Sequence, residues 1–257
     1  MIEKLKKILR PVKRRVRLQL HRGDNYYCPI CAYSSKDFSP IGVDTPVNKE
    51  KRVIGAGRRN AGCWKCNAND KTRLLYTYLI KKAKILEQNK KIKILHFAPE
   101  SHLSKLFIDS GFINYTCGDL FEEGYHYPDY VNNIDVLNIP YKDDYFDLIL
   151  CNHVLEHIPK DIEAMMELFR VLKNGGKAIL QFPISKTLTE TLEDFSVVDP
   201  SEREKVFGQW DHVRIYGQDY TKRLESAGFS VKRVNIYQEF PKYGLSKDED
   251  IFLCTKG

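Results

Sequence analysis

The chain has 257 residues, of which 42% are hydrophobic, and a formal net charge of +7. Residues 1–22 hold nine Lys or Arg and one Glu, so the rest of the chain carries a charge of −1. A positive charge confined to one end argues against a nucleic-acid groove spread over the whole protein. No apolar run reaches the ~18 residues of a transmembrane helix, and no apolar core of a secretory signal follows the N-terminus. We therefore expect a cytoplasmic protein.

The first 24 residues form a basic tail. Apolar side chains recur every three or four positions from Ile2 to Leu20, with Lys and Arg between them. This spacing predicts an amphipathic helix that is kinked or split at Pro11. Three roles fit such a helix: docking its apolar stripe on the body of the protein, lying on a membrane surface, or holding RNA phosphates. Peripheral contact with the inner membrane surface through residues 1–22 is thus one of three interpretations.

Residues 25–70 contain two C-x-x-C pairs, Cys28 with Cys31 and Cys63 with Cys66, separated by 31 residues. Four thiolates in this knuckle spacing predict one tetrahedral zinc ion in a small zinc-ribbon-like module. Two redox dithiols would need a thioredoxin-like βαβ context, which is missing. Four cysteines close the coordination sphere, so the expected role is structural, with the metal supplying much of the folding energy.

Residues 71–257 alternate between strand and helix patterns, which predicts an α/β domain with a doubly wound, seven-stranded sheet. A helix capped by Asn69 or Asp70 and running to about Gln88 should join this domain to the zinc module. The apolar run 92–97 then breaks at Ala98-Pro99, and a helical pattern follows. We expect further strands at 112–117, 133–137, 145–151, 177–182, 229–237 and 251–255, further helices at 161–173 and 220–227, and a polar stretch at 185–209.

Two carboxylates fall at successive strand ends. Asp119 stands just past the second expected strand, and Asp135 lies in the third. In open α/β sheets, ligands bind outside the carboxyl ends of the strands, and an acidic residue after the second strand binds the ribose of a nucleotide cofactor. Asp135 could receive an adenine amine. Each residue taken singly is more often a turn or cap residue, but together they favour a ligand.

At this point the chain resembles the S-adenosylmethionine-dependent methyltransferases of the Rossmann-like class, from about Lys91 to its end. The resemblance is strongest in DVLNIPYKDDYFDLILCNHVLEHI (135–158) and FRVLKNGGKAILQFP (169–183). It implies S-adenosylmethionine as the cofactor. It also implies cofactor contacts from residues at four strand ends: Phe97, Ala98, Pro99, Glu100, Asp119, Leu120, Asp135, Val136, Asn152 and His153.

The first motif departs from this family. It is HFAPE at 96–100, without the usual glycines, so a side chain replaces open backbone near the amino-acid part of the cofactor. HFAPE, the paired knuckles and FGQWDHVRIYG at 207–217 resemble a bacterial subgroup of these methyltransferases with an N-terminal zinc ribbon. Membership of that subgroup would imply a role in surface-polysaccharide or glycan biosynthesis.

Methyl transfer to a hydroxyl needs alignment of donor and acceptor and removal of one proton. Three candidate catalytic residues are His212, His153 and Asp211, and His212 is favoured because it lies in the segment expected to cover the acceptor. We expect acceptor contacts from three further residues: His157, Arg214 and Tyr216. Arg214 suggests an anionic acceptor, although it could equally pair with a neighbouring carboxylate.

Three functions remain open on the sequence. The leading one is methylation of a sugar, a glycan or a small polar metabolite, phosphorylated or not. The second is an rRNA or tRNA methyltransferase whose zinc module and basic tail hold RNA. The third is a non-catalytic binding module with a degenerate cofactor site, which the glycine-free first motif would mark.

Overall fold

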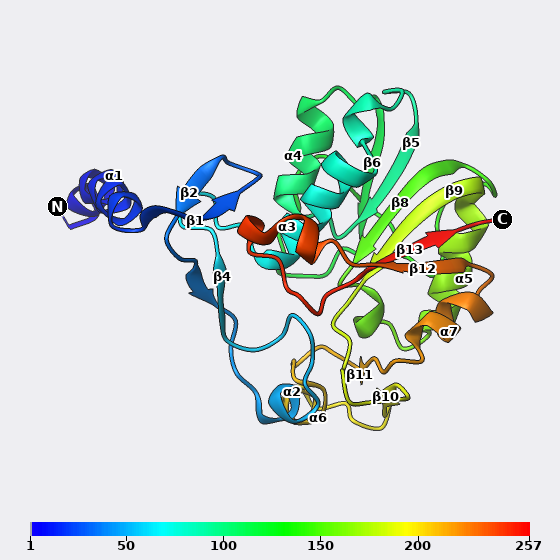
Figure 1. Cartoon of the computed structure of the whole chain (residues 1–257). Helices are drawn as coiled ribbons and strands as arrows, with labels where there is room; N and C mark the ends of the chain where they lie inside the picture. The colour runs from blue at the N-terminus through cyan, green and yellow to red at the C-terminus, as the bar shows by residue number, and fades with distance from the viewer. Residues whose placement is uncertain (1) are drawn as a thin grey trace.

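The computed structural model describes residues 2–257, and their side chains from Arg10 onward. A small N-terminal module lies beside a larger sheet domain, and the first helix projects from the module away from the sheet (Figure 1). In the described part of the chain, no helix has the length and apolarity that crossing a bilayer requires.

The larger part is built on a seven-stranded mixed sheet, as predicted. In spatial order its strands are β12 (Ser230–Val234), β13 (Ile251–Thr255), β9 (Leu172–Gln181), β8 (Phe146–Asn152), β5 (Lys93–Phe97), β6 (Asn114–Asp119) and β7 (Val131–Asn133). Only β13 among them runs against its neighbours. The chain passes from β5 to β6 on one side and later to β8 on the other. The strand order therefore reverses at β5, the kind of switch point at which ligands bind in open α/β sheets.

Helices cover both faces of this sheet, which makes it doubly wound. On one face lie α3 (Asp70–Thr77) and α4 (Ser101–Asp109), and on the other lie α5 (Asp161–Val171) and α7 (Tyr220–Ser226). Short single turns complete the helices, at 78–82, 85–87, 155–157, 237–239 and 241–243.

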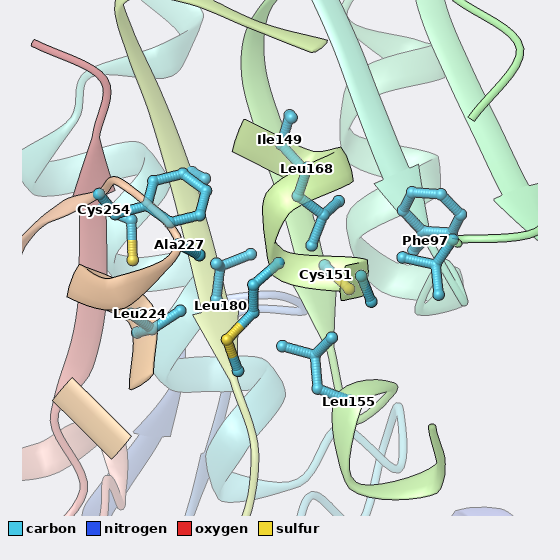
Figure 2. Close-up of a cluster of buried hydrophobic side chains, with 14 of the residues drawn as sticks. Phe97, Ile149, Cys151, Leu155, Leu168, Leu180, Leu224, Ala227 and Cys254 are labelled. Atoms are coloured by element: carbon cyan, nitrogen blue, oxygen red, sulfur yellow. The ribbon is translucent and has the colours of Figure 1, made fainter. Parts of the chain in front are cut away.

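The two faces have separate apolar cores because neighbouring strand residues point to opposite sides. Along β5, Ile94 packs in the core under α3 and α4, while Leu95 and Phe97 pack in the core under α5 and α7. Figure 2 shows the second core, in which Leu168 of α5 and Leu224 of α7 lie among side chains of β8, β9 and β13. Burial on both faces of the sheet explains the nearly continuous apolar runs of its inner strands.

The N-terminal module consists of two antiparallel hairpins and a short helix. The hairpins pair β1 (Arg22–Cys28) with β2 (Tyr33–Ser35) and β3 (Ser39–Ile41) with β4 (Arg59–Gly62). The helix α2 (Pro46–Glu50) lies in the long connection between β3 and β4.

One buried arginine ties the module to both ends of the sheet domain. Arg73 of α3 is fully buried, and its guanidinium donates hydrogen bonds of 2.7–2.8 Å to four backbone carbonyls. Two of these carbonyls, of Ala61 and Ala68, belong to the N-terminal segment, and two, of Tyr243 and Gly244, to the segment before the last strand. All four acceptors are backbone carbonyls, so the buried charge of Arg73 is stabilised by these carbonyl groups and not by a carboxylate.

An insertion between β9 and α7 contains α6 (Pro200–Phe207) and the small hairpin of β10 (Leu192–Glu193) with β11 (Arg214–Ile215). It packs against α2 of the module through a small apolar cluster that includes Val47, Phe207 and Ile215. The module and the insertion therefore meet where α2 lies against α6, at the bottom of Figure 1.

The basic tail forms one helix, α1 (Ile2–Leu20), which continues through Pro11 rather than splitting there. Val12, Val16 and Leu20 are all more than half exposed, so the described part of the apolar stripe does not dock on the body of the protein. The helix is attached instead by polar contacts, such as the bond of 3.2 Å from Arg14 Nη2 to the carbonyl of Lys65.

Several expected element boundaries need correction. The helix beginning at Asp70 is capped by Asn69 as predicted, but its regular part ends at Thr77 rather than near Gln88. The third strand ends at Asn133, because the Asp135 side chain caps a turn at the backbone N–H of Leu137. The polar stretch 185–209 contains α6, which begins where the Asp199 carboxylate accepts bonds from the next turn.

Candidate active site

A cavity of about 480 Å³, here named the strand-end cavity, lies at the carboxyl ends of the parallel strands. Its volume falls in the usual range for small-molecule sites. Seven of the ten residues predicted to contact the cofactor line it: Phe97, Ala98, Asp119, Leu120, Asp135, Val136 and His153. His157 and Asp211, predicted to face the acceptor, line it too, together with Arg203 and Trp210 of the insertion.

The two strand-end carboxylates differ in their surroundings. Burial raises the pKa of the Asp119 carboxyl, against the opposing effect of a hydrogen bond from the Leu120 backbone. One oxygen of Asp135 accepts the backbone N–H of Leu137 at 2.8 Å. Asp135 thus caps a turn and still borders the cavity, so the turn role and the ligand role predicted for it are compatible.

Two residues of the cavity wall have left-handed backbone conformations without being glycine. Ala98 follows β5 with φ of 44°, and His153 follows β8 with φ of 56°. Such conformations cost about 1–3 kcal/mol and concentrate at functional sites. Ala98 therefore adopts the backbone region that glycine favours, which shows how the turn forms although the HFAPE motif lacks glycine.

The other three predicted cofactor residues, Pro99, Glu100 and Asn152, are not among those lining this cavity. The Glu100 carboxylate contacts His96 Nε2 at 2.7 Å and accepts a bond of 3.2 Å from the Asn152 amide. Burial would raise the pKa of Glu100, but the hydrogen bond to His96 and its charge lower it overall. Oδ1 of Asn152 is buried without a hydrogen-bond partner among the described residues.

A second cavity, of about 350 Å³, lies between the N-terminal module and the insertion, and we name it the inter-module cavity. Arg59 and Lys71 line it from the N-terminal side, and Glu156 and His212 from the sheet domain and the insertion. Gly55 has φ of +70°, a conformation that glycine adopts without strain, and the end of the Lys71 side chain lies over it.

The two cavities adjoin at Trp210, which lines both. Around it, His157 and Asp211 face the strand-end cavity, whereas Glu156 and His212 face the inter-module cavity. The rings of His157 and His212 stand edge to face with their centres 4.8 Å apart. Residues from the fourth strand end and from the insertion thus meet in one wall.

Burial and charge act in opposite directions on the two buried members of this wall. Burial acts to raise the pKa of Glu156, but the contact with His153 and the nearby His157 and His212 outweigh it and lower the pKa to about 2. Burial lowers the pKa of His212 to about 4, although Glu156 acts to raise it. Near neutral pH, Glu156 is therefore a carboxylate and His212 a neutral imidazole.

Arg214 and Tyr216, predicted to contact the acceptor, have a different role in the structure. Both side chains are almost completely buried. The Arg214 guanidinium bonds the carbonyls of Leu155 and Pro159 and the Glu193 carboxylate, and the Tyr216 hydroxyl donates to Asp161 at 2.7 Å. With their polar atoms engaged, these residues fix the turn that carries Glu156 and His157. Arg214 still lines the inter-module cavity, as its predicted role requires, whereas Tyr216 lines neither cavity.

The lining residues that were not predicted include Arg59, Lys71, Glu156 and Trp210. Glu156 and Trp210 stood inside the two quoted motifs, LEHI and FGQWDHV, so their positions beside candidate histidines were a usable signal. Arg59 and Lys71 carried none, because they reach the site only through the packing of the module against the insertion.

The four predicted metal ligands come together in the module. The Sγ atoms of Cys28 and Cys66 are 3.7 Å apart, and those of Cys31 and Cys63 are 3.6 Å apart. Thiolates bound tetrahedrally at about 2.3 Å from zinc would lie about 3.8 Å from one another. The spacing therefore suits a tetrahedral ion and is far too long for a disulfide.

Glu249, beside the inter-module cavity, gives the site a testable pH dependence. Burial raises the pKa of its carboxyl to about 7, although Lys71 acts to lower it. A raised pKa contributes stability that is complete below the unfolded value of 4.5 and is lost as the pH rises through 7. We expect Glu249→Gln to increase the free energy of unfolding by about 1–3 kcal/mol at pH 8. The lower figure applies if Lys71 is destabilised in the variant, because glutamine does not carry the negative charge of the Glu249 carboxylate.

Denaturant unfolding of both proteins at pH 5 and pH 8 tests this expectation, and at pH 5 the difference should be small or absent. An equal difference at both pH values would mean that the Glu249 carboxyl titrates normally in the folded protein.

Comparison with known proteins relates one segment of the chain to methyltransferases. Residues 103–180 match the family model described as a methyltransferase domain. An uncharacterized protein of Methanocaldococcus jannaschii is 40% identical over 65 residues, which cover 24% of this chain and 28% of that protein. The match thus spans less than a third of that curated relative.

Two solved structures are similar to this chain. An S-adenosylmethionine-dependent methyltransferase from Archaeoglobus fulgidus matches with 15% identity and a TM-score of 0.44, over 71% of this chain and 94% of that chain. One from Mesorhizobium loti matches with 14% identity and a TM-score of 0.41, over 66% of this chain and 93% of that chain. The domain match at residues 103–180 spans β6, β7, β8 and much of the strand-end cavity. This segment of the chain, residues 103–180, is therefore similar to a methyltransferase domain.

Proposed function

We propose that this protein transfers a methyl group from S-adenosylmethionine, bound in the strand-end cavity, to a small polar acceptor bound in the inter-module cavity. One observation carries the proposal: Trp210 lines both cavities, so two bound molecules would be neighbours. A direct transfer needs such contact, because the reacting atoms must approach to about 3–3.5 Å.

The strand-end cavity offers groups that fit the nucleoside part of S-adenosylmethionine. Asp119 would accept bonds from the ribose hydroxyls, and Asp135 one from the adenine amine. His153, at the end of β8, lines the same cavity and would lie near the methionine part. The cofactor would supply an electrophilic methyl group on a positively charged sulfur, and the residues named here hold and orient it.

Replacing Asp119 by Ala should weaken S-adenosylmethionine binding by about 1.5–3 kcal/mol, the range for hydrogen bonds to a charged group. Calorimetric titration measures the effect, which corresponds to roughly a 10- to 150-fold larger Kd. Asp129→Ala is the matched control, because Asp129 is exposed and does not line the cavity. Equal affinity of wild type and Asp119→Ala for S-adenosylmethionine would mean that Asp119 does not bind the ribose.

The inter-module cavity suits a hydroxylated acceptor with an anionic group. Lys71 projects over Gly55 into this cavity, and burial lowers the pKa of its ammonium group although the nearby Glu249 acts to raise it. The Arg59 guanidinium is already paired with Asp70 through two bonds of 2.7 Å. We therefore assign Lys71 as the cation that binds an acidic sugar or a phosphorylated metabolite, while His212, which lines the same cavity, would act on its hydroxyl.

A labelled-methyl transfer assay tests the proposal, with acidic and neutral sugars, nucleotide sugars, phosphorylated amines and total RNA as acceptors. We expect S-adenosylhomocysteine to form with an anionic hydroxyl acceptor and the preference over neutral analogues to be lost in Lys71→Met. Transfer to RNA alone, with steep salt dependence, would support the RNA methyltransferase instead. Tight cofactor binding without product from any acceptor would support the non-catalytic module.

The remaining parts of the chain have supporting roles in this proposal. The four-cysteine cluster would hold a structural zinc ion, which the sulfur spacing supports. Helix α1 combines exposed apolar side chains with many cations, and each Lys or Arg contributes about 1 kcal/mol near an anionic membrane surface. Peripheral binding at the cytoplasmic face would suit an enzyme of surface-polysaccharide biosynthesis, which stays a prediction from the resemblance.

A further inference from the structure

In the part of the chain that the structure describes, two groups of side chains bring at least three potential metal ligands together. The first is the four-cysteine cluster. The second consists of Glu156, His157 and His212, whose ligand atoms all lie within 4.8 Å of one another. We name it the junction cluster, because its members line the wall between the two cavities.

The spacing of the junction cluster is close to what one ion requires. Two ligands that each lie about 2.1 Å from the same ion can be at most about 4.2 Å apart. The separations in the cluster, at most 4.8 Å, exceed this limit by no more than about 0.6 Å, a difference that side-chain rotation can remove.

The Glu156 carboxylate has a buried oxygen without a hydrogen-bond partner among the described residues. Its side chain is 3% exposed, and Oε1 lies 3.4 Å from Nδ1 of His153. Oε2 is buried and has no hydrogen-bond partner among the described residues. An unpaired carboxylate oxygen is costly to bury, and a cation bound between it and the two imidazoles would remove that cost.

The surroundings hold the imidazoles in place. Nδ1 of His157 lies 3.3 Å from an oxygen of Asp211, the kind of carboxylate–histidine contact that orients metal-binding rings. The backbone N–H of Val213 donates to the carbonyl of Glu156 at 3.0 Å, which fixes His212 relative to Glu156. The buried Arg214 donates hydrogen bonds to the carbonyls of Leu155 and Pro159, on either side of Glu156 and His157. These bonds hold the ligands in place before a metal ion binds, although His212 is far from the other two in sequence.

We propose that Glu156, His157 and His212 bind a divalent first-row transition-metal ion. Two imidazoles and one carboxylate are a donor set for zinc, manganese or iron, and three protein ligands leave at least one position for a further oxygen ligand. That position would lie at the junction of the two cavities, where the ion would draw in the acceptor hydroxyl and favour loss of its proton. This last role depends on the proposed function, whereas metal binding itself does not.

Titration of the full-length, zinc-loaded protein with Mn²⁺, followed by electron paramagnetic resonance, tests the site. Manganese prefers nitrogen and oxygen donors over thiolates, so it reports on the junction cluster and leaves the four-cysteine site occupied. We expect one Mn²⁺ per chain. Glu156→Gln should abolish binding, His157→Gln should weaken it at least tenfold, and Asp211→Asn should weaken it about 10–100-fold. His126→Gln, at an exposed histidine outside the cluster, should bind like wild type.

The proposal is overturned if wild type binds neither Mn²⁺ nor a second equivalent of Zn²⁺ or Co²⁺, or if the variants bind like wild type. His157 and Asp211 are partly exposed, so their variants decide the matter even if Glu156→Gln fails to fold. Metal binding without methyl transfer would contradict only the proposed function. Full transfer activity after the Mn²⁺ site is emptied, with zinc retained, would overturn the role of the ion in the reaction.

Discussion

Replacing Cys63 by Ser is expected to abolish zinc binding at the proposed four-cysteine site and to unfold the N-terminal module. Cys63 is 1% exposed, and its Sγ lies 3.6 Å from that of Cys31, so its loss breaks a closed four-sulfur site. Zinc binding contributes about 10–16 kcal/mol in small zinc-dependent domains, and the hairpins here have few apolar side chains of their own. Without the ion, the 31-residue segment between the knuckles should become open to proteases.

Elemental analysis should find one zinc per wild-type chain purified without chelator and none in Cys63→Ser, whose melting temperature should be much lower. Cys117→Ser is the control, because Cys117 lies in β6 away from the module and should leave the zinc content unchanged. Wild-type protein without metal, or a Cys63→Ser protein with an intact module, would contradict the structural zinc site.

Methyl transfer is expected to fall about 10²–10⁴-fold when His212 is replaced by Ala, the usual worth of a positioned acid–base group. His212 lines the inter-module cavity and lies against His157, whereas the other candidate, His153, borders the strand-end cavity. The cofactor site should therefore be nearly unaffected. The loss should appear in kcat, because a hydroxyl that keeps its proton is a poor nucleophile even when it is well bound.

The same loss is expected whether His212 takes the proton itself or holds a metal ion that favours its loss. Mn²⁺ affinity separates the two, since it falls in His212→Ala only if the imidazole is a ligand. A decrease in kcat of less than tenfold between pH 6 and 9 would mean that His153 is the general base, or that the acceptor is an amine that binds already deprotonated.

Much of the sheet could be predicted from the sequence, because strands buried on both faces have apolar runs that need no knowledge of their neighbours. The strand-end residues followed from this, since parallel strands bring their carboxyl ends to one edge. Asp119 and Asp135 lie in one cavity for that reason, although 16 positions separate them.

The rest of the site depends on contacts that no local pattern specifies. Lys71 and Glu156 line one cavity only because α2 packs on α6, an interface between distant segments. The hydrogen bonds from Arg214 to backbone carbonyls could not be predicted either, since an exposed and a buried arginine look alike in a sequence. A signal for α6 was present and was missed: Asp199 followed by Pro200 is typical of a helix start.

The four carbonyl partners of Arg73 limit how far this protein can fold while it is still being synthesised on the ribosome. Chains are made from the N-terminus at about 5–20 residues per second, so Ala61 and Ala68 emerge early and Tyr243 and Gly244 almost last. Until synthesis is nearly finished, the guanidinium has only half of its carbonyl partners. The nascent module should therefore stay loosely attached to α3 during translation. Fragments that stop before residue 243 should aggregate, whereas full-length chains should lock the first and last segments together after release.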